Sequence, residues 1–528
     1  MAETTAPSGE MQRTLTLTGI TVNAMALIAP GAFLWTTFEI QASQVSGKTS
    51  TAPDMWTGLV FALVLALLTA YSYSELARIY PEAGTGSSYY FAEAALLDKD
   101  KPEHQARARV AKLTIGWISH LYYWLYPAIM VGFMGILFGY IYQTAFHHTL
   151  TYIPQAAAAV LLAFVCGYIA YRGVSGSTMT SIVINVIQIT CLTLVSLLFI
   201  AYRIGHGSEV YSLANAGGVV IPHSIIHVLY QSTIAILLLV GFESVTALAA
   251  EAKRPEKDIK SGILLSLIIQ GGICYLFEYF AANFANGAKT ATFTVAAAGS
   301  TPAQHLTGYA ASAVDPAPIG TMITNIGNKM LGQTGSTVSL VVAATVLMAL
   351  LGTTLACLNT GVRVTYAMAK DKEMPGILGL LHGKYATPHG GILVLTIISA
   401  AIGVYCATPY NVDNITQITL ASNTGTFLVY GISCIIALVA FASRHDKHPV
   451  KHVLIPGLGA LMNIAELCGV VYLAITAGGS GSKDAYKALA IVGIWCLAGV
   501  IWVAINPNKG HAKGVVEERK STSIAAAV

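Results

Sequence analysis

A single glutamate, Glu243, lies inside an otherwise apolar run of the chain, in the sequence Gly241-Phe242-Glu243-Ser244. Hydrocarbon cannot solvate a carboxylate, so an ionisable residue in such a run normally faces a cavity, a partner or a path for ions and solutes. Burial favours the protonated form of a carboxyl group, whereas a nearby cation favours the charged form. Glu243 is therefore our leading candidate for a group that binds and releases a proton. The alternative is that it only hydrogen-bonds an opened helix.

Gly241 allows the helix to open beside Glu243, because glycine adopts backbone conformations that other residues avoid. Opened backbone at membrane depth is tolerated only where it is buried in protein or lines a water-filled cavity. We expect a second interruption at Ala29-Pro30-Gly31-Ala32 in the first apolar run, although a proline there can also merely kink the helix. Two interruptions at corresponding places, five runs apart, indicate a pair of inverted halves.

The composition is that of an integral membrane protein. Of 528 residues, 55% are hydrophobic and only 10% are charged, against roughly 25% charged in soluble domains. Apolar runs of about 20 residues, each long enough to cross a bilayer, recur along the chain. The predicted spans are twelve, near 16–40, 55–79, 113–143, 153–171, 177–202, 225–250, 260–285, 337–368, 388–407, 415–442, 453–477 and 485–506.

The charges between these runs predict the topology. Most of the 29 lysine and arginine residues fall in alternate loops if the N-terminus is cytoplasmic, as the positive-inside rule requires. We therefore expect a multi-pass protein of the plasma (inner) membrane, in contact with lipid, with both termini in the cytoplasm. The net charge of +4 follows from this asymmetry and calls for no nucleic-acid partner.

The chain divides into a core and three smaller parts. We predict a cytoplasmic tail over 1–12, a ten-helix core over 13–445 with repeats at about 13–202 and 225–445, two accessory helices within 446–506, and a second tail over 507–528. The stretch 286–336 lies outside and includes short apolar runs at 295–298 and 309–311, so part of it is expected to form short helices. The segment 82–112 is expected to hold an interfacial helix, with Tyr89, Tyr90 and Phe91 as membrane-interface anchors.

Several kinds of chemistry find no support in the sequence. There is no phosphate-binding GxxxxGK[ST] motif, so energy from ATP is not expected. No nucleophile elbow, paired catalytic carboxylates or clustered metal ligands occur in a plausible arrangement. We therefore predict no catalytic residues, no metal, no cofactor and no enzyme activity.

Three blocks of the sequence resemble the amino acid permeases of the amino acid, polyamine and organocation (APC) superfamily. The blocks are Gly241-Phe242-Glu243-Ser244 with the following Glu251-Ala252-Lys253-Arg254-Pro255, Tyr73-Ser74-Glu75-Leu76-Ala77, and Arg363-Val364-Thr365-Tyr366-Ala367. The resemblance covers roughly residues 14–445. It implies an all-α LeuT-type fold, a 5+5 inverted repeat with broken helices 1 and 6, and two accessory helices. It also implies a substrate site at the midplane and alternating access.

The resemblance also implies which residues of this chain form the substrate site. The family's glycine-rich break in span 1 falls on Ala29-Pro30-Gly31-Ala32-Phe33, whose amide groups would bind a carboxylate. Pro30 has no N–H, so one donor of the usual set is missing. The expected substrate-binding residues are Ala29, Pro30, Gly31, Ala32, Gly241, Phe242, Ser244 and Tyr123. Span 3 also offers Tyr122, Trp124 and Tyr126 as gating aromatics, or as ordinary packing.

The expected ion-coupling residues are Glu243, Thr353 and Thr354. A proton on Glu243 is preferred, while sodium stays open because Thr353 and Thr354 offer hard oxygen ligands. Hydroxyls in membrane helices, however, mostly bond their own backbone. Some relatives carry a lysine in span 5, where this chain has Gln188. Weaker candidates for proton binding are His120, Glu278 and Glu466.

These expectations lead to one main hypothesis and two alternatives. The main one is a secondary transporter of a small amino acid or amine, by proton-coupled symport or exchange. A polyamine or organic-cation carrier is the alternative within transport. A membrane substrate sensor or a channel is the alternative from a different class.

Overall fold

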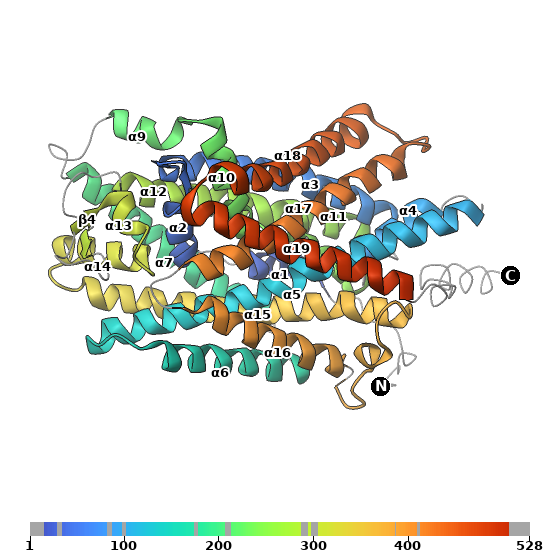
Figure 1. Cartoon of the computed structure of the whole chain (residues 1–528), viewed down its shortest axis with the longest axis horizontal. Helices are drawn as coiled ribbons and strands as arrows, with labels where there is room; N and C mark the ends of the chain where they lie inside the picture. The colour runs from blue at the N-terminus through green and yellow to red at the C-terminus, as the bar shows by residue number, and fades with distance from the viewer. Residues whose placement is uncertain are drawn as a thin grey trace, which may run out of the picture.

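The chain folds into a bundle of long helices that lie alongside one another (Figure 1). The computed structural model describes residues 15–28, 34–81, 87–97, 102–173, 178–205, 213–286, 294–296, 305–385, 387–408 and 412–505. Within these ranges, 11 helices have the length and apolar composition needed to cross a bilayer. The chain is therefore a multi-pass membrane protein.

Nine of the membrane-length helices are each assigned as a single α-helix over almost their whole length. They are α3 (Met55–Ile79), α5 (Pro102–Phe146), α6 (Tyr152–Tyr171), α7 (Thr178–Gly205), α15 (Gly335–Lys370), α16 (His389–Cys406), α17 (Asp413–Phe441), α18 (Ile455–Thr476) and α19 (Gly479–Ile505). A π-helical turn, η7 (Val450–Leu454), precedes α18.

Two further spans are assembled from shorter pieces. One joins α10 (Ile225–Ala235) to the 3₁₀ segments η3 (Ile236–Leu238) and η4 (Phe242–Glu251). The other joins α11 (Pro255–Ser266), the π-helical η5 (Leu267–Tyr275) and α12 (Leu276–Asn286).

The first predicted span, 16–40, contains two helices that are each too short to cross a bilayer. These are α1 (Leu17–Leu27) and α2 (Leu34–Ala42). Residues 29–33, where the interruption is expected, lie outside the described residues. A twelfth span, built from both helices, therefore stays a prediction.

Short elements connect the spans. They are the β1–β2 hairpin (Val45–Ser46, Thr49–Ser50), η1 (Ala52–Asp54), α4 (Ser88–Leu97), α9 (Leu213–Val220), β3 (Thr294–Ala296), β4 (His305–Thr307), α13 (Gly308–Ser312), α14 (Pro318–Met330) and η6 (Gly376–Gly379). The helix expected over 309–311 is confirmed by α13. In the other apolar run, Val295 and Ala296 pair with β4 in an antiparallel hairpin. In Figure 1, α13, α14 and β4 lie at the end of the bundle opposite α4.

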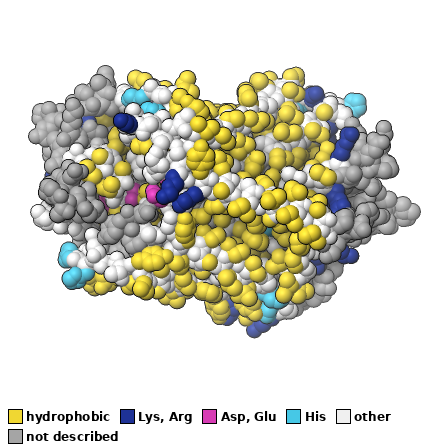
Figure 2. Space-filling model, in the orientation of Figure 1, with side chains coloured by type: hydrophobic (Ala, Val, Ile, Leu, Met, Phe, Trp, Pro, Cys, Tyr) yellow, Lys and Arg dark blue, Asp and Glu magenta, His cyan; other side chains and the backbone are white. Residues whose placement is uncertain are grey.

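The outer surface of the bundle is largely apolar. Hydrophobic side chains cover most of the middle of the visible face (Figure 2), and α19 exposes Ile494 and Val500, 69% and 67% accessible. Such a surface suits lipid rather than water.

The prediction that Tyr89, Tyr90 and Phe91 anchor the membrane interface is wrong. All three are buried in the protein, at most 2% exposed. The Tyr89 hydroxyl donates to Asp371 at 2.9 Å, and the Lys112 ammonium lies 4.9 Å from the Tyr89 ring centroid. Charged partners from α5 and the end of α15 draw these aromatics inward, and the sequence around α4 gives no sign of them.

Candidate functional site

The helix of the sixth predicted span opens where the sequence predicts. The α-helix ends at Ala235, a 3₁₀ turn follows, and Gly241 has a φ of 120° before η4 begins. Residues that carry a side chain rarely adopt this backbone conformation, so the position favours glycine. A Cβ added to Gly241 would lie 2.6 Å from the Cβ of Leu27. The opening at Gly241 is therefore in direct contact with the end of α1.

The end of α1 is held by polar side chains from two other spans. The last carbonyl groups of a helix have no partner within it. Here the Tyr275 hydroxyl donates to the carbonyl of Ile28 at 2.6 Å, and the Thr353 hydroxyl donates to that of Ala26 at 3.0 Å. Spans 7 and 8 thus satisfy the main chain just before the region expected to be interrupted.

Glu243 is the centre of a buried hydrogen-bond cluster. It is fully buried, with Oε1 accepting from the Tyr122 hydroxyl at 2.5 Å. Oε2 accepts from the Tyr430 hydroxyl at 2.7 Å and from the Gly241 N–H at 3.1 Å. The Tyr123 hydroxyl lies farther, 3.4 Å from Oε1. None of the ion pairs found among the described residues involves Glu243. Its carboxyl group is therefore stabilised by neutral donors from α5, α17 and its own span.

The other predicted residues of span 6 lie around this carboxyl group. Phe242 is buried, with its ring centroid 5.2 Å from that of Tyr430 and 6.1 Å from that of Tyr73. The Ser244 hydroxyl donates to the carbonyl of Gly241 at 2.6 Å, which stabilises the opened turn. The structure thus brings together four of the eight residues expected to bind substrate: Gly241, Phe242, Ser244 and Tyr123.

The remaining four residues expected to bind substrate, Ala29, Pro30, Gly31 and Ala32, lie outside the described residues. Of the two threonines, Thr353 reaches α1 through its bond to Ala26. Thr354 donates only to the carbonyl of Leu350 on its own helix, at 2.7 Å. The structure therefore places one of the two hydroxyls near the span 1 region.

Sequence reasoning missed Tyr430 and underrated Tyr122. Tyr430 lies in an apolar helix, and no neighbour in the sequence relates it to Glu243. The same helix carries Ser433, whose hydroxyl donates to the Tyr73 hydroxyl at 3.0 Å, while Tyr73 bonds Ser88 at 2.5 Å. These contacts link α17, α3 and α4 beside the Glu243 cluster. These contacts can be recognised only in the folded bundle, where the three helices face one another.

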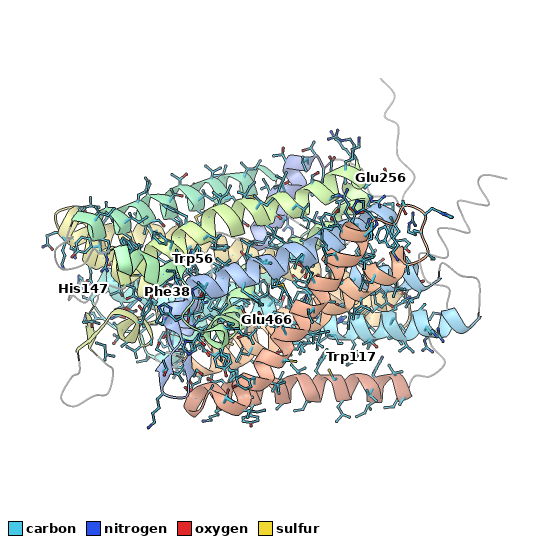
Figure 3. All side chains as sticks on the ribbon, turned by 90° about the horizontal axis from the view of Figure 1, so that it is seen from above. Phe38, Trp56, Trp117, His147, Glu256 and Glu466 are labelled. Carbon is cyan, nitrogen blue, oxygen red and sulfur yellow. The ribbon has the colours of Figure 1, made fainter. Side chains whose placement is uncertain are left out.

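The weaker candidates lie in other surroundings. His120 bonds the hydroxyl of Thr365 at 3.0 Å. Glu466 accepts a hydrogen bond from Ser232 at the contact between α18 and α10, and Figure 3 shows its position. The carboxyl oxygens of Glu278 and the amide of Gln188 have no hydrogen-bond partner among the described residues.

Chemically, the Glu243 cluster offers one buried carboxyl group whose oxygens accept hydrogen bonds from neutral hydroxyl and main-chain N–H donors. In the part of the chain that the structure describes, no group of three or more His, Cys, Asp or Glu side chains could hold a metal ion.

Comparison with known proteins places the chain among transporters. The family model described as amino acid permease matches residues 42–512. The branched-chain amino acid permease BcaP of Bacillus subtilis is 25% identical over 439 residues, which are 80% of this chain and 79% of that protein. The methylthioribose transporter of the same organism is 23% identical over 415 residues, 76% of each chain. The low-affinity putrescine importer PlaP of Escherichia coli is 28% identical over 273 residues, 51% of this chain and 54% of that protein.

The family model covers most of the chain, from the end of α2 to beyond α19. The blocks around Glu75, Glu243 and Arg363 all lie within it. This chain belongs to the amino acid permease family of the APC superfamily.

Proposed function

We propose that the chain is a secondary active transporter that moves amino acids across the plasma membrane by alternating access, in symport with protons or by exchange. The observation that carries this proposal is the buried carboxyl group of Glu243, held at the opening of span 6 against the end of α1. Alternation alone moves a solute only downhill, so accumulation needs a coupled ion or an exchanged solute. A carboxyl group at the opened helix is suited to interact with a coupled ion and with an exchanged solute.

The proposed architecture is the LeuT-type 5+5 inverted repeat with twelve spans. In it, α1 and α2 are the two halves of a broken first span, and α10 and η4 are the halves of the sixth. The repeats occupy about 13–202 and 225–445, α18 and α19 are the accessory pair, and both termini are cytoplasmic. The end of α1 at Leu27 and the opening at Gly241 support this arrangement.

We infer that the substrate lies between the two openings. Its carboxylate would bind main-chain N–H groups at Ala29, Gly31 and Ala32, because the start of a helix presents unpaired donors and a positive dipole end. Its ammonium group would face Glu243 and the carbonyls freed at Gly241. Proton coupling is preferred to sodium coupling, because Glu243 is a buried carboxyl group that has only neutral hydrogen-bond donors among the described residues.

A polyamine or organic-cation carrier is the second candidate. The specific observation in its favour is that Glu243 has no cationic partner among the described residues, so a substrate ammonium group would be its natural counter-charge. Similarity to a protein named as a putrescine importer over about half of the chain agrees with this. Inhibition of uptake by putrescine but not by neutral amino acids would select this candidate.

The direct test is uptake by the purified protein in proteoliposomes. Radiolabelled amino acids and amines are offered with and without an inward pH gradient. We expect saturable uptake of at least one amino acid, accelerated by the gradient. Liposomes that take up no amino acid and no amine under either condition would rule out the proposed function.

A further inference from the structure

A groove of about 300 Å³ lies between the turn that follows α15 and the last turn of α19. Both helices end at the α4 end of the bundle (Figure 1), which is the cytoplasmic end in the proposed topology. The groove is lined by Ala369, Lys372, Met374, Pro375, Gly376 and Trp502. Sites for small molecules begin at roughly this volume. The groove is therefore a candidate ligand site, and it is separate from the Glu243 cluster.

The groove lies where the lipid-facing surface of α19 ends. Ile505, the last residue of α19, is 71% exposed, and Ile377 in the neighbouring η6 is 63% exposed. Exposed apolar side chains at the end of a membrane-length helix suit the boundary between hydrocarbon and headgroups. Tryptophan is enriched at that boundary because its ring is apolar and its N–H is polar. Trp502 places the groove at the level of the lipid headgroups.

Trp502 forms a fixed wall of the groove. Its Nε1 donates to the carbonyl of Glu373 at 2.9 Å. Its ring stacks on that of Trp117, with centroids 6.5 Å apart and planes 21° apart, and Trp117 stacks in turn on Trp495 at 5.0 Å. These contacts join α19 to α5 and to the turn after α15. The wall is therefore formed without a ligand.

Lys372 supplies the charge of the groove. It is exposed and lies between two acidic residues, Asp371 and Glu373. Asp371 pairs with Lys112 at 2.5 Å, and Glu373 pairs with Arg109 at 3.5 Å. Among the described residues, none of the ion pairs involves Lys372. Its acidic neighbours already have cationic partners, so the ammonium group of Lys372 remains available to an anion.

The backbone at Lys372 does not favour a lysine. The turn after α15 is a Schellman motif, in which the N–H of Glu373 donates to the carbonyl of Met368 at 2.8 Å. The N–H of Lys372 donates to the carbonyl of Ala369 at 3.2 Å, and the φ of Lys372 is 61°. Glycine is the usual residue here because it adopts a positive φ without strain. The turn alone therefore does not explain why a long cationic side chain occupies this position.

We propose that this groove binds the headgroup of an anionic phospholipid in the leaflet at the α4 end. The ammonium group of Lys372 holds the phosphate, the glycerol backbone lies against Trp502, and the acyl chains run along the exposed face of α19. The unpaired positive charge selects an anion, and the apolar residues around the groove select one that carries hydrocarbon. This site does not depend on which solute the protein transports.

The test uses the full-length protein in nanodiscs of phosphatidylcholine that contain a trace of photoreactive phosphatidylglycerol. Mass spectrometry measures the labelling of the peptides that contain 369–376 and Trp502. Unlabelled phosphatidylglycerol is then added to compete. For Lys372→Gly we expect the mole fraction of competitor that halves the labelling to rise about fivefold, the effect of one basic side chain near an anionic surface.

Lys372→Gly also separates lost binding from poor folding. Glycine relieves the left-handed backbone of the turn, so this variant should unfold at the same temperature as the wild type or a higher one when only phosphatidylcholine is present. Lys372→Arg keeps the charge and should retain most of the affinity. Lys384→Gln is the matched control, because Lys384 is an exposed cation of the same connection that does not line the groove. It should bind phosphatidylglycerol like the wild type.

Four outcomes would overturn the proposal. An unchanged affinity in Lys372→Gly would remove the lysine from the site, and an equal loss in Lys384→Gln would show only a general effect of charge. Competition by soluble glycerol phosphate as strong as that by phosphatidylglycerol would indicate a site for soluble anions. Competition by added phosphatidylcholine as strong as that by phosphatidylglycerol would show that the groove does not select charge.

Discussion

Buried carboxyl groups in this protein differ in what faces them, and this difference decides what each can do. Glu243 accepts three hydrogen bonds of 3.1 Å or less from Tyr122, Tyr430 and Gly241. Asp315, in the connection between α13 and α14, accepts from the Ala317 N–H at 2.9 Å. The first is stabilised by donors from three spans. The second is mainly desolvated.

Asp315 gives a prediction about stability and pH. Burial raises its pKa above the ordinary value, although hydrogen bonds from Thr321 and Ala317 oppose the change. The folded state therefore holds the proton more tightly than the unfolded state, and this contribution is lost as pH rises through the raised pKa. Asparagine keeps the acceptor for Ala317 and carries no charge. We expect Asp315→Asn to unfold at a higher temperature than the wild type at neutral pH, with the advantage shrinking toward pH 4.

Thermal unfolding of the detergent-purified protein across that pH range measures the effect. Asp446→Asn is the control, because Asp446 is exposed and hydrogen bonds from Arg444 lower its pKa, so its loss should not stabilise the protein at neutral pH. The explanation fails if the difference between Asp315→Asn and the wild type is the same at every pH.

At the scale of elements, the opened helix of span 6 meets the end of α1 through a glycine. Gly241 combines a positive φ with close contact to Leu27, so a side chain there is strained by its own backbone and has no space. We expect Gly241→Ala to cost about 1–3 kcal/mol of stability and to reduce transport roughly tenfold or more, as measured by thermal unfolding and uptake.

Gly352→Ala is the matched control for this change. Gly352 lies within α15, and a Cβ added there meets no heavy atom within 4 Å. Alanine should be tolerated or slightly stabilising at this helical position. If Gly241→Ala transported and unfolded like Gly352→Ala, the contact between Gly241 and the end of α1 would have no functional weight.

Much of the arrangement of helices could be predicted from the sequence, because the signals for spans and for the helix opening are local. Apolar runs give the spans, Gly241 gives the opening of span 6, and Glu243 is conspicuous among apolar neighbours. The contacts of Tyr122 and Tyr430 could not be predicted, since they depend on which faces of α5 and α17 turn toward span 6. The burial of Tyr89 was missed for the same reason, because its partner Asp371 lies 282 residues away in the sequence.

At the scale of the whole molecule, charged networks join the spans at the α4 end of the bundle. Lys112 pairs with Glu93 at 2.8 Å and with Asp371 at 2.5 Å, linking α5 to α4 and to the end of α15. At the same end, Glu75 pairs with Lys260 at 2.5 Å, linking α3 to α11. Alternating access would require contacts at this end to separate when the Glu243 cluster opens toward the cytoplasm.

These salt-bridge networks account for many of the charged residues at the α4 end of the bundle. An intact salt bridge that is largely removed from water contributes little net stability, but removing one of its partners is costly because a buried charge is left uncompensated. Such contacts can keep one face closed while the opposite face admits substrate.

The most direct test of the central claim is the pH dependence of uptake in proteoliposomes containing the wild type or Glu243→Gln, with Glu466→Gln as the control. If Glu243 carries the coupled proton, uptake by the wild type and by Glu466→Gln rises as the external pH falls, and the profile of Glu243→Gln is flat. A Glu243→Gln protein that transports with the wild-type pH profile would contradict the account.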